Sequence, residues 1–453
     1  MHLALEETIC ALSTPQGVGG IAVIRVSGRE ALAIVDRVLD RSISAGPGYR
    51  AHFARLMRDG AILDEVVAVV FRGPHSYTGE DTVEISVHGS SYIQQKALEV
   101  LQAAGARLAT PGEYTMRAYL NGKIDLSQAE AVADLIAVET EAAHQQAIHQ
   151  MRGGFSHEIN RLRDQLIEFA SLVELELDFS EEDVEFADRT RLRLLLRQIE
   201  GVVRHLIDSF ALGNAIKNGV PVAILGAPNA GKSTLLNALL NEDRAIVSPI
   251  AGTTRDTVED HMVIAGIRFN FIDTAGIRDT TDEIEQMGIA RSFAKAQSAQ
   301  IVVLLCDGAH TDPHDYEKFV QDMQERSGGS KKFVRVVNKA DQMPQRNFGD
   351  DVLYISAKTG QGVESLKAHF ASLLQLEHLQ SSSTIVTNAR HHQALSKALV
   401  SILEIQTGMD IGTSSDFLAV DIRKTLHHLG EIVGKVQADD LLNSIFSKFC
   451  IGK

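Results

Sequence analysis

The sequence lacks the features that would place it in a membrane or in the secretory pathway. No run approaches the roughly 18 to 20 apolar residues that a membrane span requires. The first residues, MHLALEETICAL, include Glu6 and Glu7 and contain no basic segment. Neither a secretory signal nor an arginine-rich transit peptide is therefore expected, and we expect a cytosolic protein.

An excess of positive charge is also absent. Lys and Arg number 44 and Asp and Glu number 59, so the formal net charge is −15. A chain that holds nucleic acid unaided usually carries the opposite balance. Any contact with RNA should therefore need a local basic patch or a partner.

Cysteine is scarce, and neither cysteine nor histidine has the spacing of a metal site. Cys10, Cys306 and Cys450 are widely separated and odd in number, which fits a reducing compartment and makes zinc unlikely. The histidine pairs at 391–392 and 427–428 fall in expected helices. Adjacent helical side chains diverge by about 100°, which disfavours joint metal binding by either pair.

The 453 residues, 44% of them apolar, are enough for two to four globular domains. Short β-rich runs at 21–28, 64–73 and 82–89 alternate with a helical stretch at 92–105, which favours an α+β domain. Apolar residues three and four apart over 159–173 indicate a long helix. The acidic run that follows at 180–185 is expected to be a solvated helix connection.

An α/β pattern follows and is itself followed by helices. Five short apolar runs alternate with helical segments, which indicates a mainly parallel sheet buried on both faces; they are 221–226, 268–273, 301–307, 333–338 and 352–356. A polar linker at 380–384 precedes helices expected near 389–406, 416–429 and 437–449. We predict a multidomain chain with an α+β domain, a discontinuous α-helical domain and an inserted α/β Ras-like domain, with segments 1–122, 123–216, 217–379 and 380–453.

The strongest motif is 226-GAPNAGKS-233, which fits the phosphate-loop pattern between an apolar strand and a helix. Backbone N–H groups of such a loop surround phosphates, Lys232 supplies a charge at the β/γ oxygens, and Ser233 can ligate Mg²⁺. The nucleotide-binding residues predicted here are Asn229, Ala230, Gly231, Lys232, Ser233 and Thr234.

Three further motifs indicate that the bound nucleotide is GTP. Asp273 of 273-DTAG-276 ends a strand where a carboxylate can support Mg²⁺. In 338-NKAD-341, Asn338 offers an amide and Asp341 a carboxylate suited to the N1 and 2-amino donors of guanine. The run 356-SAK-358 can close over the base. The residues predicted to contact GTP are Asp273, Thr274, Ala275, Gly276, Asn338, Lys339, Asp341, Ser356, Ala357 and Lys358.

The catalytic apparatus is the unusual part of this GTPase pattern. Thr254 in 252-GTTRD-256 is predicted to meet Mg²⁺ when the γ-phosphate is present. The residue after DTAG is Ile277, where many GTPases carry a water-orienting Gln. Because Ile has no donor or acceptor, help with water and charge must come from elsewhere.

These motifs, with Asn229, the inserted domain and the terminal 450-CIGK-453, resemble the tRNA-modification GTPases of the MnmE (TrmE) family, among the TrmE-Era-EngA-like GTPases. The resemblance covers essentially the whole chain. It implies a homodimeric, K⁺-activated GTPase whose G domains approach each other during turnover. It assigns K⁺ to Asn229, Ser248, Ile250 and Thr253, and water positioning to Glu285, with Asp282 and Glu283 as alternatives.

The resemblance also gives the first domain a task. It implies a site for a tetrahydrofolate derivative, 5-formyl- or 5,10-methylene-tetrahydrofolate, at Arg25, Glu84, Lys123 and Lys453. A carboxylate can accept the N–H pair of a pterin, and Arg and Lys can meet its carboxylate tail. Cys450 is either a reactive thiol or part of a packed tail, and CIGK is a poor prenylation motif.

Two classes of function remain open. The resemblance implies that the chain, with an FAD-dependent partner (MnmG) in a heterotetramer, installs an aminomethyl or carboxymethylaminomethyl group at C5 of the wobble uridine of certain tRNAs, with tRNA bound largely by the partner. The alternative is a ribosome-assembly or regulatory GTPase that acts as a switched binding module. A folate transferase with a vestigial nucleotide domain is disfavoured by the intact nucleotide-site residues Lys232, Ser233, Asp273 and Asn338.

Overall fold

The computed structural model divides into two compact units. One comprises Met1–Ala137, Ala147–Glu200 and Lys397–Lys453, and the other comprises Val138–Gln146 and Gly201–Ser396. The residues described are 6–178, 189–240, 261–272, 297–327, 331–343, 346–374, 384–436, 442, 445–447 and 449–452. Three of the four limits between these units fall inside helices, so the limits follow packing. The four segments drawn from the sequence stay predictions.

The first unit contains a six-stranded sheet with strand order β3-β4-β5-β2-β1-β6. Its neighbours pair antiparallel except β1 with β6, which are parallel. The strands are β1 (Ile9–Leu12), β2 (Ile21–Ser27), β3 (Arg50–Arg58), β4 (Ala61–Phe71), β5 (Thr82–His88) and β6 (Arg107–Leu108). The predicted strands at 21–28, 64–73 and 82–89 are confirmed as β2, β4 and β5.

The two faces of this sheet differ in chemistry. Ile24 and Val26 of β2 are buried with helices α1 (Ala31–Val38) and α2 (Ser91–Ala103) on one face. Because side chains alternate along a strand, Arg25 and Ser27 lie on the other face. Helix α3 (Glu113–Leu120) contacts this second face through Tyr114, whose hydroxyl donates to the carbonyl of Arg25 at 2.7 Å. The sheet thus has an apolar core on one side and a polar layer on the other.

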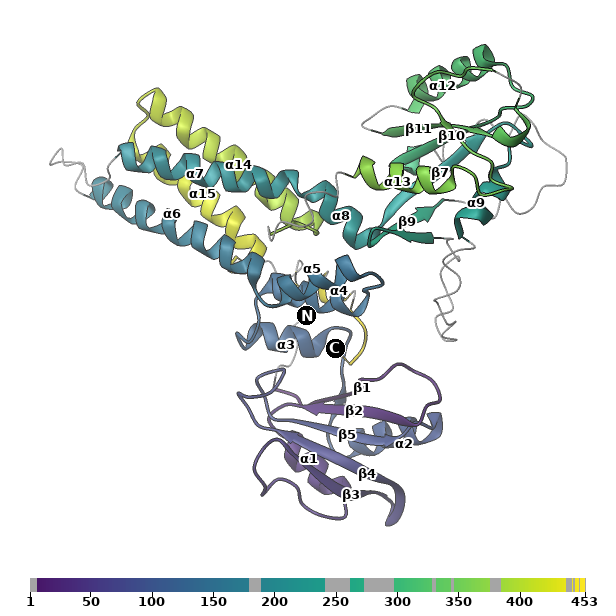
Figure 1. Cartoon of the computed structure of the whole chain (residues 1–453). Helices are drawn as coiled ribbons and strands as arrows, with labels where there is room; N and C mark the ends of the chain where they lie inside the picture. The colour runs from purple at the N-terminus through teal and green to yellow at the C-terminus, as the bar shows by residue number, and fades with distance from the viewer. Residues whose placement is uncertain are drawn as a thin grey trace. The chain divides into compact units, whose positions relative to one another are not determined.

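Long helices make up the rest of the first unit (Figure 1). The apolar positions predicted along one face of 159–173 are buried in α6 (Gly154–Asp178), which packs against α15 (Ser415–Val433). Helix α4 (Leu126–Ile136) also lies in this unit, and three more helices lie partly in it, α5 (Glu141–Met151), α7 (Arg189–Asp208) and α14 (Ala389–Asp410). Segments from both halves of the chain therefore build one helical domain.

The second unit contains a six-stranded sheet with order β12-β11-β10-β7-β9-β8. All neighbours pair parallel except β8 with β9. The strands are β7 (Val220–Gly226), β8 (His261–Ile264), β9 (Ile267–Phe271), β10 (Ile301–Asp307), β11 (Lys332–Asn338) and β12 (Leu353–Tyr354). The mainly parallel sheet predicted from the apolar runs is confirmed.

Both faces of this sheet are buried, as its continuous apolar strands predict. Val303 and Leu305 of β10 pack in a cluster with α9 (Lys232–Leu240) and α13 (Val363–Leu373). Val302 and Leu304 face the opposite way, into a cluster with α12 (Pro313–Ser327). The unit also contains α8 (Phe210–Asn218) and the short 3-10 helix η3 (Ala340–Gln342). Within the described residues, no helix is both long and apolar enough to cross a membrane.

Candidate functional site

The loop between β7 and α9 needs glycine at two positions. A Cβ on Gly226 would lie 2.2 Å from the carbonyl oxygen of Leu305, and one on Gly231 would lie 2.2 Å from Asn338 Nδ2. Gly231 also has φ +95°, a conformation that L side chains rarely adopt. These contacts bring the loop against the ends of the neighbouring strands β10 and β11.

Lys232 is the first residue of α9 and bends back over this loop. Its Nζ donates to the carbonyl oxygens of Gly226 at 2.9 Å and Ala227 at 2.8 Å. An ammonium that reaches the loop carbonyls is within reach of a phosphate bound by the loop N–H groups. Ser233 and Thr234 follow in the same first turn, where N–H groups and the helix dipole favour an anion.

Asn338 connects three of the predicted motifs. Its Nδ2 donates to the carbonyl oxygen of Ala230 in the phosphate loop at 2.9 Å, and its Oδ1 accepts from the N–H of Ala357 at 2.9 Å. The side chain is 2% exposed, so these bonds form out of water. The structure therefore brings the 226–233, 338–341 and 356–358 motifs together at one edge of the sheet, as expected for ligands of parallel α/β sheets.

Asp341 lies at the exposed rim of this edge. A hydrogen bond from Ser356 is the main cause that lowers the pKa of the Asp341 carboxyl, and the nearby charge of Lys358 adds to it. The carboxylate is thus kept ionised, which is the form that accepts two N–H groups of guanine. These residues can bind a guanine base between 338–341 and 356–358.

Asp307 is a part of this edge that the motifs did not reveal. It ends β10 opposite Asn338, and its Oδ2 accepts from Lys339 Nζ at 2.6 Å. Burial raises the pKa of Asp307, but the hydrogen bonds from Lys339 and His310 outweigh burial and lower it. Asp307 therefore holds Lys339, which has a left-handed backbone at φ 60°.

Several predicted residues of the nucleotide site lie outside the described residues. They are Ser248, Ile250, Thr253, Thr254, Asp273, Thr274, Ala275, Gly276 and Glu285, and Ile277 lies in the same stretch. Asn229 is described, is exposed and has φ 61°.

In the first unit, Arg25 and Glu84 form an ion pair across β2 and β5. Arg25 Nε and Nη2 donate to Glu84 Oε1 at 3.0 and 2.7 Å. The guanidinium carbon lies 5.5 Å from the ring centroids of both Tyr77 and Tyr114. Neither tyrosine was singled out from the sequence, and each supplies an aromatic surface beside the charged pair.

Lys123 reaches the same region through the loop at 73–80. Its Nζ donates to the carbonyl oxygen of Pro74 at 2.8 Å, while Tyr77 of the same loop contacts Arg25. The structure therefore links Lys123 and Arg25 through one loop. Lys453, the fourth residue predicted for folate, lies outside the described residues.

The C-terminal tail packs against the first sheet. The N–H of Gly112 donates to the carbonyl oxygen of Cys450 at 3.5 Å, and a Cβ on Gly452 would lie 2.2 Å from the carbonyl oxygen of Leu12. Cys450 is exposed, whereas Cys10 and Cys306 are buried. Burial raises the pKa of each buried thiol to about 12, so neither is a nucleophile near neutral pH.

The histidine pair at 427–428 was not expected to form a metal site, but its side chains lie close to a third possible metal ligand. His427 and His428 each approach Glu431, and the possible ligand atoms of the three residues lie within 4.8 Å of one another. Glu431 is four positions after His427 and three after His428, so its side chain lies beside both rings although the rings point in different directions. The distances from Glu431, 3.5 Å to His427 Nε2 and 3.3 Å to His428 Nδ1, fit helix-surface hydrogen bonds.

Comparisons with known proteins agree with this arrangement. The family described as "GTP-binding protein TrmE N-terminus" matches residues 8–123, and the family described as "MnmE helical domain" matches residues 126–450. Proteins named tRNA modification GTPase MnmE are similar over nearly the whole chain. The one from Cytophaga hutchinsonii is 53% identical and covers 99% of this chain and 98% of its own, and the one from Flavobacterium johnsoniae is 52% identical and covers 99% of each.

Solved structures resemble only part of the chain. The G domain of the T. maritima FeoB iron transporter covers 34% of this chain and 97% of its own, at 25% identity and a TM-score of 0.25. That score is too low to support a conclusion about the fold. The family assignment therefore depends on the full-length sequence relatives.

Proposed function

The chain belongs to the MnmE family of tRNA modification GTPases, and from this membership we propose that it couples GTP hydrolysis to the formation of an aminomethyl or carboxymethylaminomethyl group at C5 of uridine 34 in certain tRNAs. The observation that carries the proposal is the identity of about half the residues with curated relatives over 99% of the chain. The connection of three GTPase motifs through Asn338 supports the nucleotide half.

For GTP, the residues divide into those that hold phosphate and those that read the base. We assign the phosphates to the loop N–H groups, Lys232 and Ser233, and the guanine base to Asn338 and Asp341. The Lys232 ammonium is held over the loop carbonyls, so it can move to a phosphate without reorganising the backbone. The family binds GTP with Mg²⁺, and Ser233 and Thr254 would hold the metal. When bound, Mg²⁺ offsets charge on the β and γ phosphates.

K⁺ in place of an arginine is the second part of the proposal. Asn229, Ser248, Ile250 and Thr253 would hold K⁺, and Glu285 would orient water in place of a Gln at position 277. A cation at that position supplies the charge that an arginine finger supplies elsewhere, which is worth on the order of 10³ to 10⁵ in rate. Of these residues only Asn229 is described. Its exposed position in the phosphate loop is compatible with cation binding.

The folate part depends on the first unit. Arg25, Glu84, Lys123 and Lys453 would bind a tetrahydrofolate derivative that carries the one-carbon unit. The tyrosines beside Arg25 support this assignment, because the pyrimidine part of a tetrahydropterin is planar and can stack on such side chains. Arg25 now neutralises Glu84, so a ligand must either join this pair or exchange one partner. A reactive role for Cys450 stays open within this proposal.

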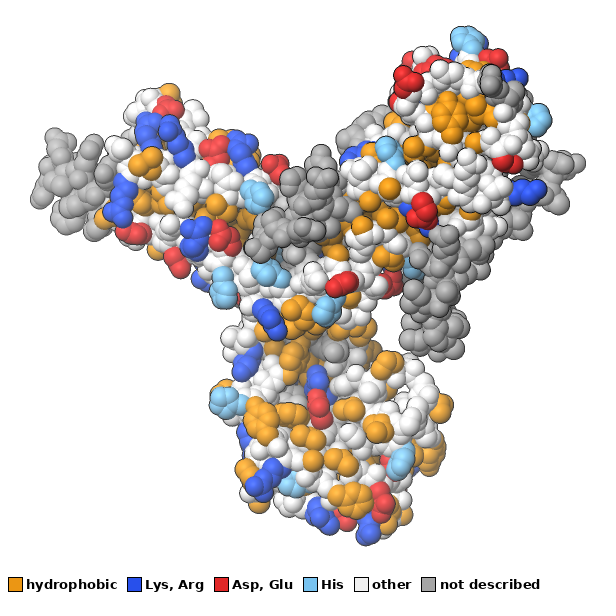
Figure 2. All heavy atoms as spheres, viewed as in Figure 1, with side chains coloured by type: hydrophobic (Ala, Val, Ile, Leu, Met, Phe, Trp, Pro, Cys, Tyr) orange, Lys and Arg blue, Asp and Glu red, His pale blue; other side chains and the backbone are white. Residues whose placement is uncertain are grey.

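The partners complete the proposal. A homodimer would associate with FAD-dependent MnmG in a cytosolic heterotetramer, with tRNA bound largely by the partner. On the described surface visible in Figure 2, side chains of both charge signs are interspersed over each unit. Together with the net charge of −15, this distribution supports a partner as the source of most phosphate contacts.

The test is mass spectrometry of tRNA nucleosides from cells with and without the gene. Loss of the C5 substituent from wobble uridine on deletion is expected. A ribosome-assembly GTPase would instead leave the modified uridines in place and would retain no folate on purification, and that result would reject the proposal.

The cation is tested separately, by GTP turnover in KCl and in NaCl at equal ionic strength. The wild-type chain should be much faster in KCl, and Asn229→Ala should lose most of the difference. Equal wild-type rates in both salts would remove K⁺ from the proposal, and an unaffected Glu285→Ala variant would remove that residue.

A further inference from the structure

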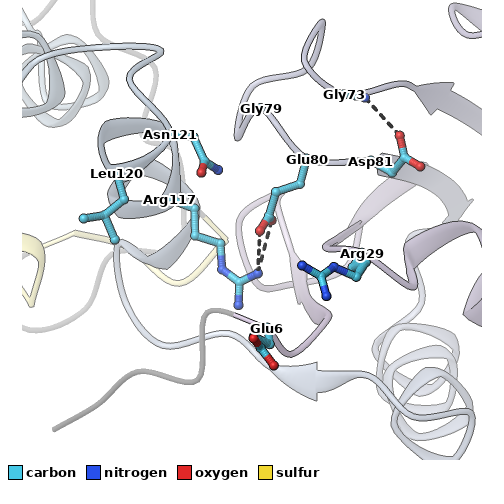
Figure 3. A pocket seen from close by; sticks show the side chains of 9 residues that line it. All are labelled: Glu6, Arg29, Gly73, Gly79, Glu80, Asp81, Arg117, Leu120 and Asn121. Carbon is cyan, nitrogen blue, oxygen red and sulfur yellow. Dashed lines mark hydrogen bonds and ion pairs between the residues drawn. The ribbon is translucent and has the colours of Figure 1, made fainter.

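A cavity in the first unit lies beside the proposed folate residues and does not include them. It has a volume of about 480 Å³, and its charged lining residues are Glu6, Arg29, Glu80, Asp81 and Arg117 (Figure 3). The residues assigned to folate and described in the structure, Arg25, Glu84 and Lys123, are absent from its lining. The cavity can therefore hold a ligand of its own.

The floor of the cavity is an ion pair that the fold holds in place. Arg117 Nη1 donates to both carboxylate oxygens of Glu80, at 3.1 and 3.2 Å, and Ser27 Oγ donates to Glu80 Oε2 at 3.0 Å. Arg117 is 1% exposed, and its Nη2 is bound by the Glu7 carbonyl and by Glu113. A carboxylate is thus fixed at a defined position facing the cavity.

Arg29 and Glu6 are the exposed charged residues of the cavity lining, and their charges are not paired within the described part of the chain. Neither side chain forms a hydrogen bond or ion pair with another described residue. In Figure 3 the Arg29 guanidinium points toward the Glu80–Arg117 pair, and Glu6 lies beside Arg117. Asp81 instead points to Gly73, whose N–H it accepts at 2.9 Å. A ligand would therefore meet one unpaired guanidinium and two carboxylates.

This set of charges selects among ligand classes. Three carboxylates and two guanidiniums give the lining a charge of 2 − 3 = −1. A polyanion such as a phosphate or the glutamate tail of a folate is disfavoured by that balance, and an apolar ligand would leave the charges without partners. A small zwitterion suits both ends, because its carboxylate can meet Arg29 while its ammonium meets Glu6 and Glu80.

The proposed reaction needs such a molecule. A carboxymethylaminomethyl group contains an N–CH₂–COO⁻ unit that a one-carbon carrier cannot supply, and a small amino acid has this composition. We propose that the cavity binds the amine-donor substrate, a small zwitterionic amino acid, with Arg29 on its carboxylate and Glu6 and Glu80 on its ammonium. This inference depends on the proposed function.

The test uses the full chain with its redox partner, tRNA and folate, with glycine and ammonium as the two amine probes. Arg29→Gln should raise the glycine concentration for half-maximal modification by about 10- to 100-fold, the effect of removing a charged hydrogen bond. Ammonium has no carboxylate, so its use should not depend on Arg29. When both amines are present, the product of the variant should therefore shift from carboxymethylaminomethyl to aminomethyl uridine.

The matched control is Arg41→Gln, because Arg41 is an exposed arginine of the same domain, 3.8 Å from Asp40 and outside the cavity. It should leave the glycine dependence and the product ratio unchanged. Urea denaturation of the first unit reports whether each variant is folded. If Arg29→Gln has the glycine dependence and product ratio of the wild type, the inference is overturned while the proposed function stands. If the wild type modifies no tRNA with either amine, both the proposed function and the inference are rejected.

Discussion

The nucleotide edge of the second sheet and the polar layer of the first are built in different ways. The nucleotide edge depends on the backbone. Glycines permit close approach, and Asn338 joins three loops through one carbonyl and one N–H. The polar layer depends on charged side chains that satisfy one another, such as Arg25 with Glu84 and Arg117 with Glu80 and Glu113.

This difference separates binding from stability. A loop built from backbone contacts can present N–H groups to a ligand, and Lys232 lies over the loop carbonyls, so substitutions there should reduce activity more than stability. In the polar layer the buried charges compensate one another. Removal of a fully buried partner such as Arg117 leaves buried charge less well compensated and destabilises the fold itself, whereas Arg25 and Glu84 are partly exposed and should tolerate the loss of one partner.

The largest effect is expected from Arg117→Met. Arg117 and Glu113 are each 1% exposed, so the variant removes one of the two arginines that compensate the buried Glu113 and leaves Glu80 without its arginine. The free energy of unfolding of the first unit should fall by about 3 to 5 kcal/mol, measured by urea denaturation. The control Arg55→Met, at a half-exposed arginine 3.5 Å from Glu65, should change it by less than about 0.5 kcal/mol. Similar losses in both variants would remove the distinction between the two regions.

Lys232→Ala should have the next largest effect, on activity. Loss of the ammonium that bends over the phosphate loop should reduce kcat/KM for GTP by about 10²- to 10³-fold. Folate binding and the unfolding of the first unit should stay as in the wild type. Lys318→Ala, at an exposed position on α12, is the matched control. A Lys232→Ala chain with normal turnover would contradict the assignment of the loop.

Asp341→Asn should change which base is accepted. An amide offers one acceptor in place of two, so GTP should bind about 10- to 100-fold more weakly. Xanthosine triphosphate, whose ring presents an oxygen where guanine has its amino group, should gain affinity because the amide N–H can donate to it. Competition binding with the two nucleotides measures the change. Equal weakening for both would show that Asp341 does not contact the base.

The smallest effect concerns pH and Asp307. Because the pKa of this carboxyl is lowered in the fold, its pairing with Lys339 is fully present above the ordinary value of 3.8 and is lost as pH falls through the lowered pKa. Asp307→Asn should cost the second unit about 1 kcal/mol at pH 7. Urea denaturation at several pH values should show that the variant and the wild type differ in free energy of unfolding, and that this difference becomes smaller only below about pH 4. A difference that narrows already between pH 7 and 5 would contradict the lowered pKa.

The sequence predicted the nucleotide edge better than the polar layer, for a physical reason. Strand β10 was predicted at its observed limits because a strand buried on both faces is apolar at every position. The phosphate loop is contiguous, so its pattern can be recognised in eight residues. The pairing of Asp307 with Lys339 was missed because the two residues are 32 positions apart. Neither the apolar run that ends at Asp307 nor the motif that contains Lys339 indicates that the other is its neighbour.

In the first unit, much less was predictable. Strands β1, β3 and β6 were not predicted; β3 mixes exposed and buried positions, and β6 has only two residues. The contacts of Arg25 with Tyr77 and Tyr114 join three segments of the chain and follow from the sheet register, which the sequence alone does not specify. The family resemblance supplied Arg25, Glu84 and Lys123 as residues without indicating that Arg25 and Glu84 pair with each other.

The most direct test of the account is complementation of a strain that lacks the gene, with wobble uridine modification measured by nucleoside mass spectrometry. The wild-type chain should restore the modification, whereas Lys232→Ala in the second unit and Arg25→Ala in the first should each fail although both proteins accumulate. Full restoration by either variant would contradict the claim that one reaction needs both the nucleotide edge and the polar layer.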